Sequence, residues 1–302
     1  MSKKLLYLLS MLLTIIVGCW LYYMFCCNCS KKECCDKTDK DKLPETEMSF
    51  SGFQISGEDF SYKTSDNFKF LSAKFNHLEP LSDSLQNGIL KLKDYLSKEN
   101  ANLKITGYAL STENNSSAFP NLGFARANDV KNFLVKQGLP ENKLEIFGEV
   151  KDVLSQRNDT IFGPLSFNLF KVSEENNSSY KDWSAIKDKI NANPVILYFE
   201  TGQTAIDVSA EDRAKIAEMV DYLGHVAGSK ISVTGHTDNV GNRDNNIKLA
   251  LERANFAKDY LVTNGITSEK INVTSLGPDK PIADNATAEG RAKNRRTELR
   301  IE

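Results

Sequence analysis

One polar loop near the C-terminal end of the chain carries side chains whose types and spacing suit a binding site. Asp238 stands in this loop, shortly after the apolar-alternating run Ile231–Gly235, which is typical of a short strand. Arg253 follows within a helical pattern. We predict that Asp238 and Arg253 form the two poles of one site. The alternative is a plain surface ion pair, which would contribute about 0–1 kcal/mol.

The residues around this loop indicate neither a metal site nor a catalytic nucleophile. Of the 3 histidines in the chain, only His236 stands next to Asp238, and no ligand cluster surrounds it in the sequence. No nucleophile is paired with a recognisable general base. We therefore expect a binding protein with no catalytic residues, no metal and no cofactor, rather than an enzyme.

Strand and helix patterns alternate around the loop. Strand patterns cover Val195–Phe199, Ile231–Thr234, Lys270–Thr274 and Arg296–Ile301, the last as an exposed-edge or half-buried strand. Helical patterns follow the candidate N-cap Ser209, run from about Asn246 to Thr263 before the stop at Gly265, and cover Glu289–Asn294. The alternation predicts an α/β (α+β) two-layer sandwich with helices on one face of the sheet.

The chain also matches itself at a constant offset. Asp94-Tyr-Leu matches Asp221-Tyr-Leu, Arg126-Ala-Asn matches Arg253-Ala-Asn, and Gly138 matches Gly265, while Leu103–Gly107 matches Ile231–Gly235 after a shift of one position. We interpret this pattern as two tandem copies of one fold, residues 48–173 and 183–302. The polar segment 174–182 between them is predicted to be a linker.

The second copy resembles the OmpA-like C-terminal domain, the peptidoglycan-associating module of outer-membrane proteins, Pal-type lipoproteins and flagellar stator subunits. The matching pieces are the 195–199 strand, Gly235-His-Thr-Asp-Asn-Val-Gly241, Asn246-x-x-Leu249, Arg253-Ala254 and Asn294-Arg-Arg296. Together they cover nearly all of residues 193–302, and the combination is far more specific than any single piece.

The resemblance implies non-catalytic binding of peptidoglycan through the diaminopimelate of its peptide stem. The end of that side chain carries an ammonium and a carboxylate on one carbon, so Asp238 is expected to take the ammonium and Arg253 the carboxylate. Asn246 lies two helical turns before Arg253, on the same stripe of the helix. Thr237, Asn239 and Arg296 are supporting candidates.

The first copy departs from this pattern at the site itself. Gly107-Tyr-Ala-Leu110 stands in place of Gly235-His-Thr-Asp238, so the aspartate is lost. Arg126 remains, but Phe119 occupies the place of Asn246, and Pro164-Leu-Ser-Phe stands where the Arg295-Arg296 pair would fall. We predict that residues 48–173 keep the fold without binding diaminopimelate. Arg126 is then expected to be a charge on a helix surface.

The N-terminus carries a membrane signal. Leu5 to Phe25 is an almost uninterrupted apolar run without charges, long enough to cross a bilayer as one helix. We favour an uncleaved anchor within residues 1–30, in contact with membrane lipid. A lipoprotein acylated at Cys19, after Ile16-Val-Gly18, and a removed signal peptide are the alternatives. All 6 cysteines lie between Cys19 and Cys35, and residues 31–47 read as a flexible charged tether.

These features together predict a membrane-anchored tether to peptidoglycan in a bacterial envelope, with residues 48–302 in the periplasm. An inner-membrane anchor is favoured over an outer-membrane lipoprotein. An envelope scaffold or adaptor, acting through protein contacts of residues 48–173, is the alternative. A motor stator is disfavoured because Leu5 to Phe25 holds no ionisable group for ion conduction. The net charge of −2 does not favour nucleic acid as a partner.

Overall fold

The computed structural model describes residues 13, 15–17, 52–172, 181–199 and 208–302. By its internal contacts the chain divides into Met1–Met48 and Ser49–Glu302, and the description below concerns the second unit. No helix among the described residues is long and apolar enough to cross a membrane. The anchor predicted at Leu5 to Phe25 lies almost wholly outside the described residues. So do Cys19, the cysteine cluster, the charged tether and most of the predicted linker.

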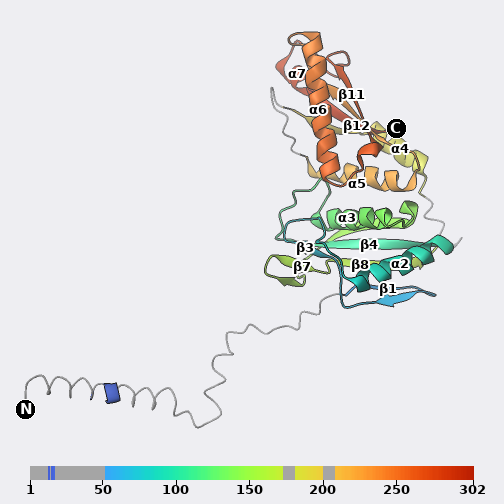
Figure 1. Ribbon diagram of the computed structural model, residues 1–302. Coiled ribbons are helices and arrows are strands. Elements are labelled where there is room, and N and C mark those ends of the chain that lie inside the picture. The colour runs from blue at the N-terminus through green and yellow to red at the C-terminus, as the bar shows by residue number, and fades with distance from the viewer. Residues whose placement is uncertain (1–12, 14, 18–51, 173–180, 200–207) are drawn as a thin grey trace, which may run out of the picture. The chain divides into compact units, whose positions relative to one another are not determined.

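The C-terminal half is a mixed α/β fold around one sheet (Figure 1). Its elements are α4 (Trp183–Ala192), β9 (Val195–Tyr198), α5 (Ala210–His225), β10 (Ile231–His236), α6 (Arg243–Thr263), β11 (Ile271–Gly277), α7 (Ala288–Asn294) and β12 (Arg296–Ile301). The strand order is β11-β10-β12-β9, with β10 and β11 parallel and the other pairs antiparallel. Every predicted strand and helix of this half is therefore confirmed, and α4 is an addition.

Local capping explains where the two long helices begin and end. Ser209 caps α5 as predicted, since its side-chain oxygen accepts a hydrogen bond from the Asp212 amide. The helix α6 begins earlier than the predicted Asn246 because Asn242 accepts from the amides of Asp244 and Asn245. Gly265 follows α6 with a φ of +87°, a conformation that glycine adopts without steric cost.

The strand β12 decides between the two positions expected for Arg296–Ile301. It is not an exposed edge, because it pairs with β10 on one side and β9 on the other, and its buried face confirms the half-buried alternative. One face of the strand buries Thr297, Leu299 and Ile301 in the core. The charged residues on its opposite face produced the edge-like sequence pattern.

The N-terminal half contains the same central arrangement of three strands. Its elements are β1 (Gln54–Ser56), β2 (Ser61–Lys63), β3 (Lys69–Leu71), α2 (Asp83–Lys98), β4 (Ala101–Leu110), α3 (Leu122–Lys136), β5 (Leu144–Lys151), β6 (Gln156–Arg157), β7 (Thr160–Phe162) and β8 (Leu165–Lys171). The strand order is β5-β4-β8, with β4 parallel to β5 and antiparallel to β8. This is the same order and the same set of strand directions as β11-β10-β12 in the C-terminal half.

A strand glycine lets the helix approach the sheet closely in both halves. A Cβ atom added to Gly107 of β4 would lie 2.0 Å from the carbonyl oxygen of Gly123 in α3. A Cβ atom on Gly235 of β10 would lie 2.0 Å from the carbonyl oxygen of Ala250 in α6. The helix that carries each arginine is thus seated against the strand that precedes the site loop.

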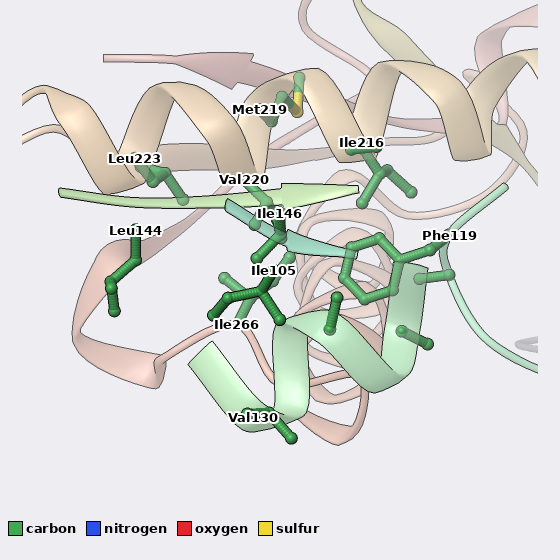
Figure 2. Packing of buried hydrophobic residues seen from close by; sticks show 14 of the residues in the cluster. Ile105, Phe119, Val130, Leu144, Ile146, Ile216, Met219, Val220, Leu223 and Ile266 are labelled. Atoms are coloured by element: carbon green, nitrogen blue, oxygen red, sulfur yellow. The ribbon is translucent and has the colours of Figure 1, made fainter. Parts of the chain in front are cut away.

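The two halves share packed surface. A single cluster of buried apolar side chains contains residues of both, and Figure 2 shows Ile216 and Val220 pointing from α5 toward the strand that carries Ile146. Polar contacts accompany this packing. The Ala118 amide donates to Asn264 Oδ1 at 2.7 Å, and Arg213 Nη1 donates to the carbonyl of Ser117 at 2.7 Å.

Candidate functional site

The loop after β10 presents Asp238 in a fixed conformation. The Thr237 amide donates to the carbonyl of Gly277 at 2.9 Å, which joins the start of the loop to the end of β11. The Val240 amide donates to Asp238 Oδ1 at 3.1 Å. Asn246 Nδ2, from the first turns of α6, donates to the carbonyls of Val240 at 3.0 Å and Asp238 at 3.4 Å. Asn246 is therefore buried against the loop and shapes it.

Arg295 provides a basic group on Asp238 that the sequence analysis did not single out. Its Nη1 lies 3.0 Å from Asp238 Oδ2, and both side chains keep 15% of their surface exposed. Arg295 sits between α7 and β12, where its carbonyl accepts a hydrogen bond from the Phe199 amide at 3.2 Å. The end of β9, the start of β12 and the loop after β10 therefore meet at one place.

Arg253 joins this place from α6. Its side chain is 1% exposed, and its guanidinium carbon lies 5.1 Å from the centre of the Phe199 ring, a cation–π contact. Burial lowers the pKa of the Arg253 guanidinium, Arg295 lowers it further, and Asp238 acts in the opposite direction. Asp238, Arg253 and Arg295 thus form a common electrostatic environment, drawn from three separate segments of the chain.

Arg296 lies in different surroundings from its neighbour. Its guanidinium contacts Glu298, with Nε at 2.8 Å and Nη2 at 2.7 Å from Oε1, and Nη2 also donates to the carbonyl of Lys280 at 3.3 Å. Arg295 precedes β12 and Arg296 is its first residue, and the two guanidiniums contact different partners, Asp238 and Glu298. A ligand contact by Arg296, or by the exposed Asn239, stays a prediction without a structural contact to support it.

His236 is buried beside this charged cluster on β12. Its Nε2 lies 4.0 Å from Glu298 Oε1. Burial lowers the pKa of His236 from 6.5 to about 4, and Arg296 and Arg300 lower it while Glu298 raises it. Within the described parts of the chain, no group of histidine, cysteine, aspartate and glutamate side chains is arranged to hold a metal ion.

The equivalent arginine of the N-terminal half is not a surface charge, which corrects the expectation for Arg126. Its side chain is 0% exposed, because α3 packs on β4 and β5 with Arg126 toward the interior. The guanidinium is held by Glu113, with Nη1–Oε2 at 3.0 Å and Nη2–Oε1 at 2.5 Å. Helical spacing alone could not reveal this burial, since the buried partner comes from a loop.

Comparison with known proteins assigns the C-terminal half to a class. Residues 198–295 match the model of the OmpA family, and this segment is an OmpA-like domain. The chain is 36% identical over 123 residues to outer membrane porin F of Pseudomonas aeruginosa, which covers 37% of this chain and 35% of the porin.

Two further proteins are similar to part of the chain. Peptidoglycan-binding protein ArfA of Mycobacterium tuberculosis is 38% identical over 98 residues, 32% of this chain and 30% of ArfA. The crystal structure of the peptidoglycan-associated lipoprotein from Burkholderia pseudomallei aligns with a TM-score of 0.32 and 26% identity, over 35% of this chain and 89% of that one. The chain spans about a third of the length of the curated relatives it matches.

Proposed function

We propose that this protein is a membrane-anchored, non-catalytic peptidoglycan-binding protein that tethers an envelope membrane to the cell wall. The observation that carries the proposal is the convergence of Asp238, Arg253 and Arg295 at one place within an OmpA-like domain. ArfA, which is 38% identical to this chain over 98 residues, is named a peptidoglycan-binding protein.

The ligand group that fits this set of charges is the free end of diaminopimelate. That end holds an ammonium and a carboxylate on one carbon, so it needs an acceptor and a forked donor a few ångströms apart. Asp238 serves as acceptor for the ammonium, and the Arg253 guanidinium offers parallel N–H groups to the carboxylate. Arg295, in contact with Asp238, adds a second positive charge beside the carboxylate.

Burial of the site increases the strength of these contacts. Arg253 is almost fully desolvated, so a carboxylate that reaches it gains more than it would on an exposed arginine. Asp238 and Arg295 each keep part of their side chains exposed, which gives the ligand an approach. Asn246 contributes by fixing the backbone of the loop around Asp238.

We assign the N-terminal half as a degenerate copy of the same fold, with no affinity for diaminopimelate. The matching strand order and the matched glycines Gly107 and Gly235 support this assignment. A residue equivalent to Asp238 is missing, and the carboxylate of Glu113 already contacts Arg126. This half therefore acts as a spacer between anchor and binding domain, or, in the adaptor alternative, as the surface for a protein partner.

The decisive experiment is retention of the full-length chain, solubilised in detergent, on purified sacculi. Wild type is compared with Asp238→Ala and Arg253→Ala, each expected to reduce retention at least about tenfold, as loss of a buried charged contact implies. Two exposed charges of α6, Glu252→Ala and Lys248→Ala, serve as matched controls and should bind as wild type. Retained binding by both site variants defeats the site assignment. Absence of binding by wild type favours the adaptor.

The mode of anchoring has its own test. Mass spectrometry of the mature N-terminus distinguishes an intact chain with Leu5 to Phe25 from one that begins at a diacylated Cys19. An inner-membrane span predicts the intact chain. A mature protein beginning at an acylated cysteine would move the anchor to the lipoprotein class.

A further inference from the structure

A fully buried ion pair lies in the half without a proposed ligand. Arg126 and Glu113 are 0% and 2% exposed, and they meet through two parallel N–H···O contacts. The Arg126 guanidinium makes two further hydrogen bonds. Its Nε donates to the carbonyl of Lys74 at 3.0 Å, and its Nη1 donates to the carbonyl of Tyr108 at 2.9 Å. The centre of the Phe70 ring lies 5.5 Å from the Arg126 guanidinium carbon, a cation–π contact.

The carboxylate is equally well held. The Ala73 amide donates to Glu113 Oε1 at 2.8 Å and the Leu110 amide to Oε2 at 2.8 Å. Burial by itself would raise the pKa of Glu113, but the hydrogen bonds from Arg126, Leu110 and Ala73 outweigh it and lower the pKa below its usual value. Glu113 is thus an ionised carboxylate with four donors, the contact set of a bound carboxylate ligand.

Arg126 corresponds in position to Arg253. Each arginine projects from a helix that packs closely against a strand glycine. Each guanidinium carbon also lies near the centre of a phenylalanine ring, 5.5 Å from that of Phe70 for Arg126 and 5.1 Å from that of Phe199 for Arg253. In the N-terminal half, however, the carboxylate at the arginine is covalently part of the chain.

The segment that carries Glu113 continues directly into the contact with the C-terminal half. Within residues 111–121, the carbonyls of Asn115 and Ser117 accept from Arg213 Nη1 at 3.1 and 2.7 Å. The Ala118 amide donates to Asn264 Oδ1. Anchoring this segment at Glu113 therefore fixes the backbone groups that Arg213 and Asn264 contact.

We infer that Arg126 marks a carboxylate-binding site occupied by the chain's own Glu113, and that this internal ligand holds segment 111–121 in the conformation that docks the C-terminal half. The ligand class is a small monocarboxylate. Replacing Glu113 by alanine removes a methylene and a carboxylate, which together have the size of acetate. The vacated site is therefore expected to accept acetate. This inference is independent of the diaminopimelate proposal, because it concerns a different arginine and a different ligand.

The test is chemical rescue of the full-length chain in detergent. Thermal unfolding of Glu113→Ala is followed at pH 7 in sodium acetate and in sodium chloride of equal ionic strength. Acetate should raise the Tm of Glu113→Ala by about 3 °C or more beyond its effect on wild type, and the rise should saturate. Glu113→Gln, which keeps the site filled, and the exposed control Glu149→Ala should show no such rise. An equal response of Glu113→Ala and Glu149→Ala would overturn the inference.

A second readout addresses docking and covers a variant that folds poorly. In chloride, hydrogen exchange of segment 111–121 and of the peptide around Asn264 should accelerate in Glu113→Ala, and acetate should restore protection. If this variant is unfolded in chloride, the yield of refolding with and without acetate replaces the comparison, and equal yields contradict the inference. Sacculus binding, measured separately on the same variant, tests the diaminopimelate proposal.

Discussion

Arg295, and not its sequence neighbour Arg296, places a guanidinium on Asp238, with Nη1 3.0 Å from Oδ2. Arg296, the first residue of β12, contacts Glu298 instead. The two arginines of the Asn294-Arg-Arg296 motif therefore have separate tasks. The first belongs with the proposed ligand site, and the second stabilises the sheet.

This separation predicts opposite outcomes for two alanine variants. Arg295→Ala should reduce sacculus binding by about tenfold with little loss of stability, since the Arg295 side chain is itself partly exposed, whereas that of Arg296 is buried. Arg296→Ala should lower the free energy of unfolding by about 2–3 kcal/mol, because Glu298 loses a buried charged partner. Urea unfolding and pull-down on sacculi measure the two effects. A stable Arg296→Ala variant that fails to bind would reverse the assignment.

His236 makes the free energy of unfolding depend on pH, because its pKa differs between the folded and the unfolded chain. In the folded protein its pKa is lowered from 6.5 to about 4, so below pH 6.5 the unfolded chain binds a proton that the folded chain does not. Stability is therefore fully present above pH 6.5 and falls as the pH drops toward 4, by up to about 3 kcal/mol. His236→Gln should flatten this part of the profile, as measured by urea unfolding at several pH values. An unchanged slope in the variant would show that His236 is not the titrating group.

Close helix–strand contact at Gly235 predicts strong sensitivity to a single methyl group. Gly235→Ala would place Cβ 2.0 Å from the Ala250 carbonyl oxygen and must displace α6, with a loss of about 3 kcal/mol or more. In the control Gly228→Ala, the added Cβ meets no atom within 4 Å. Its loss of stability comes only from the φ of +76° and should be about 1 kcal/mol. Thermal unfolding compares them. Equal losses would mean that α6 is not seated on β10 as described.

The sequence predicted the C-terminal half well because its signals are local. Period-two and helical patterns, the Ser209 cap and Gly265 located the elements within a few residues. Asp238 and Arg253 were proposed from spacing and resemblance, and the structure brings them into a common electrostatic environment. Whether they bind diaminopimelate stays a prediction.

What the sequence could not give depends on the direction of side chains and on distant contacts. Arg295 and Arg296 are adjacent and chemically identical, and only the folded chain shows which one reaches Asp238. Glu113 lies in a polar loop without a motif, and its contact with Arg126 forms only when the loop folds over α3. The packing of α5 against the N-terminal half likewise involves residues far apart in the chain.

The interface between the halves holds a second group of charges. Lys270 Nζ donates to both oxygens of Glu141 at 2.8 and 2.9 Å, and the nearly buried Lys131 lies 3.4 Å from the same carboxylate. Burial lowers the pKa of the Lys131 ammonium. The charge of Lys270 also lowers this pKa, whereas the carboxylate of Glu141 raises it.

Glu141→Gln should therefore destabilise the protein by about 1–2 kcal/mol at pH 7, because two ammonium groups then lose their shared carboxylate. The deficit should shrink as the pH rises and Lys131 loses its proton. Differential scanning calorimetry from pH 7 to 10 measures both effects, with the exposed Glu149→Gln as control. A deficit independent of pH would argue against the buried lysine as its cause.

The central claim, recognition of the free end of diaminopimelate by Asp238 and Arg253, is tested most directly by competition. Full-length protein bound to sacculi is eluted with meso-diaminopimelate or with cadaverine, the 1,5-diaminopentane that keeps both ammonium groups and has no carboxylate. Diaminopimelate should release the protein at concentrations at least about tenfold below those of cadaverine, since only diaminopimelate offers a carboxylate to Arg253. Equal release by both compounds, or by neither, would contradict it.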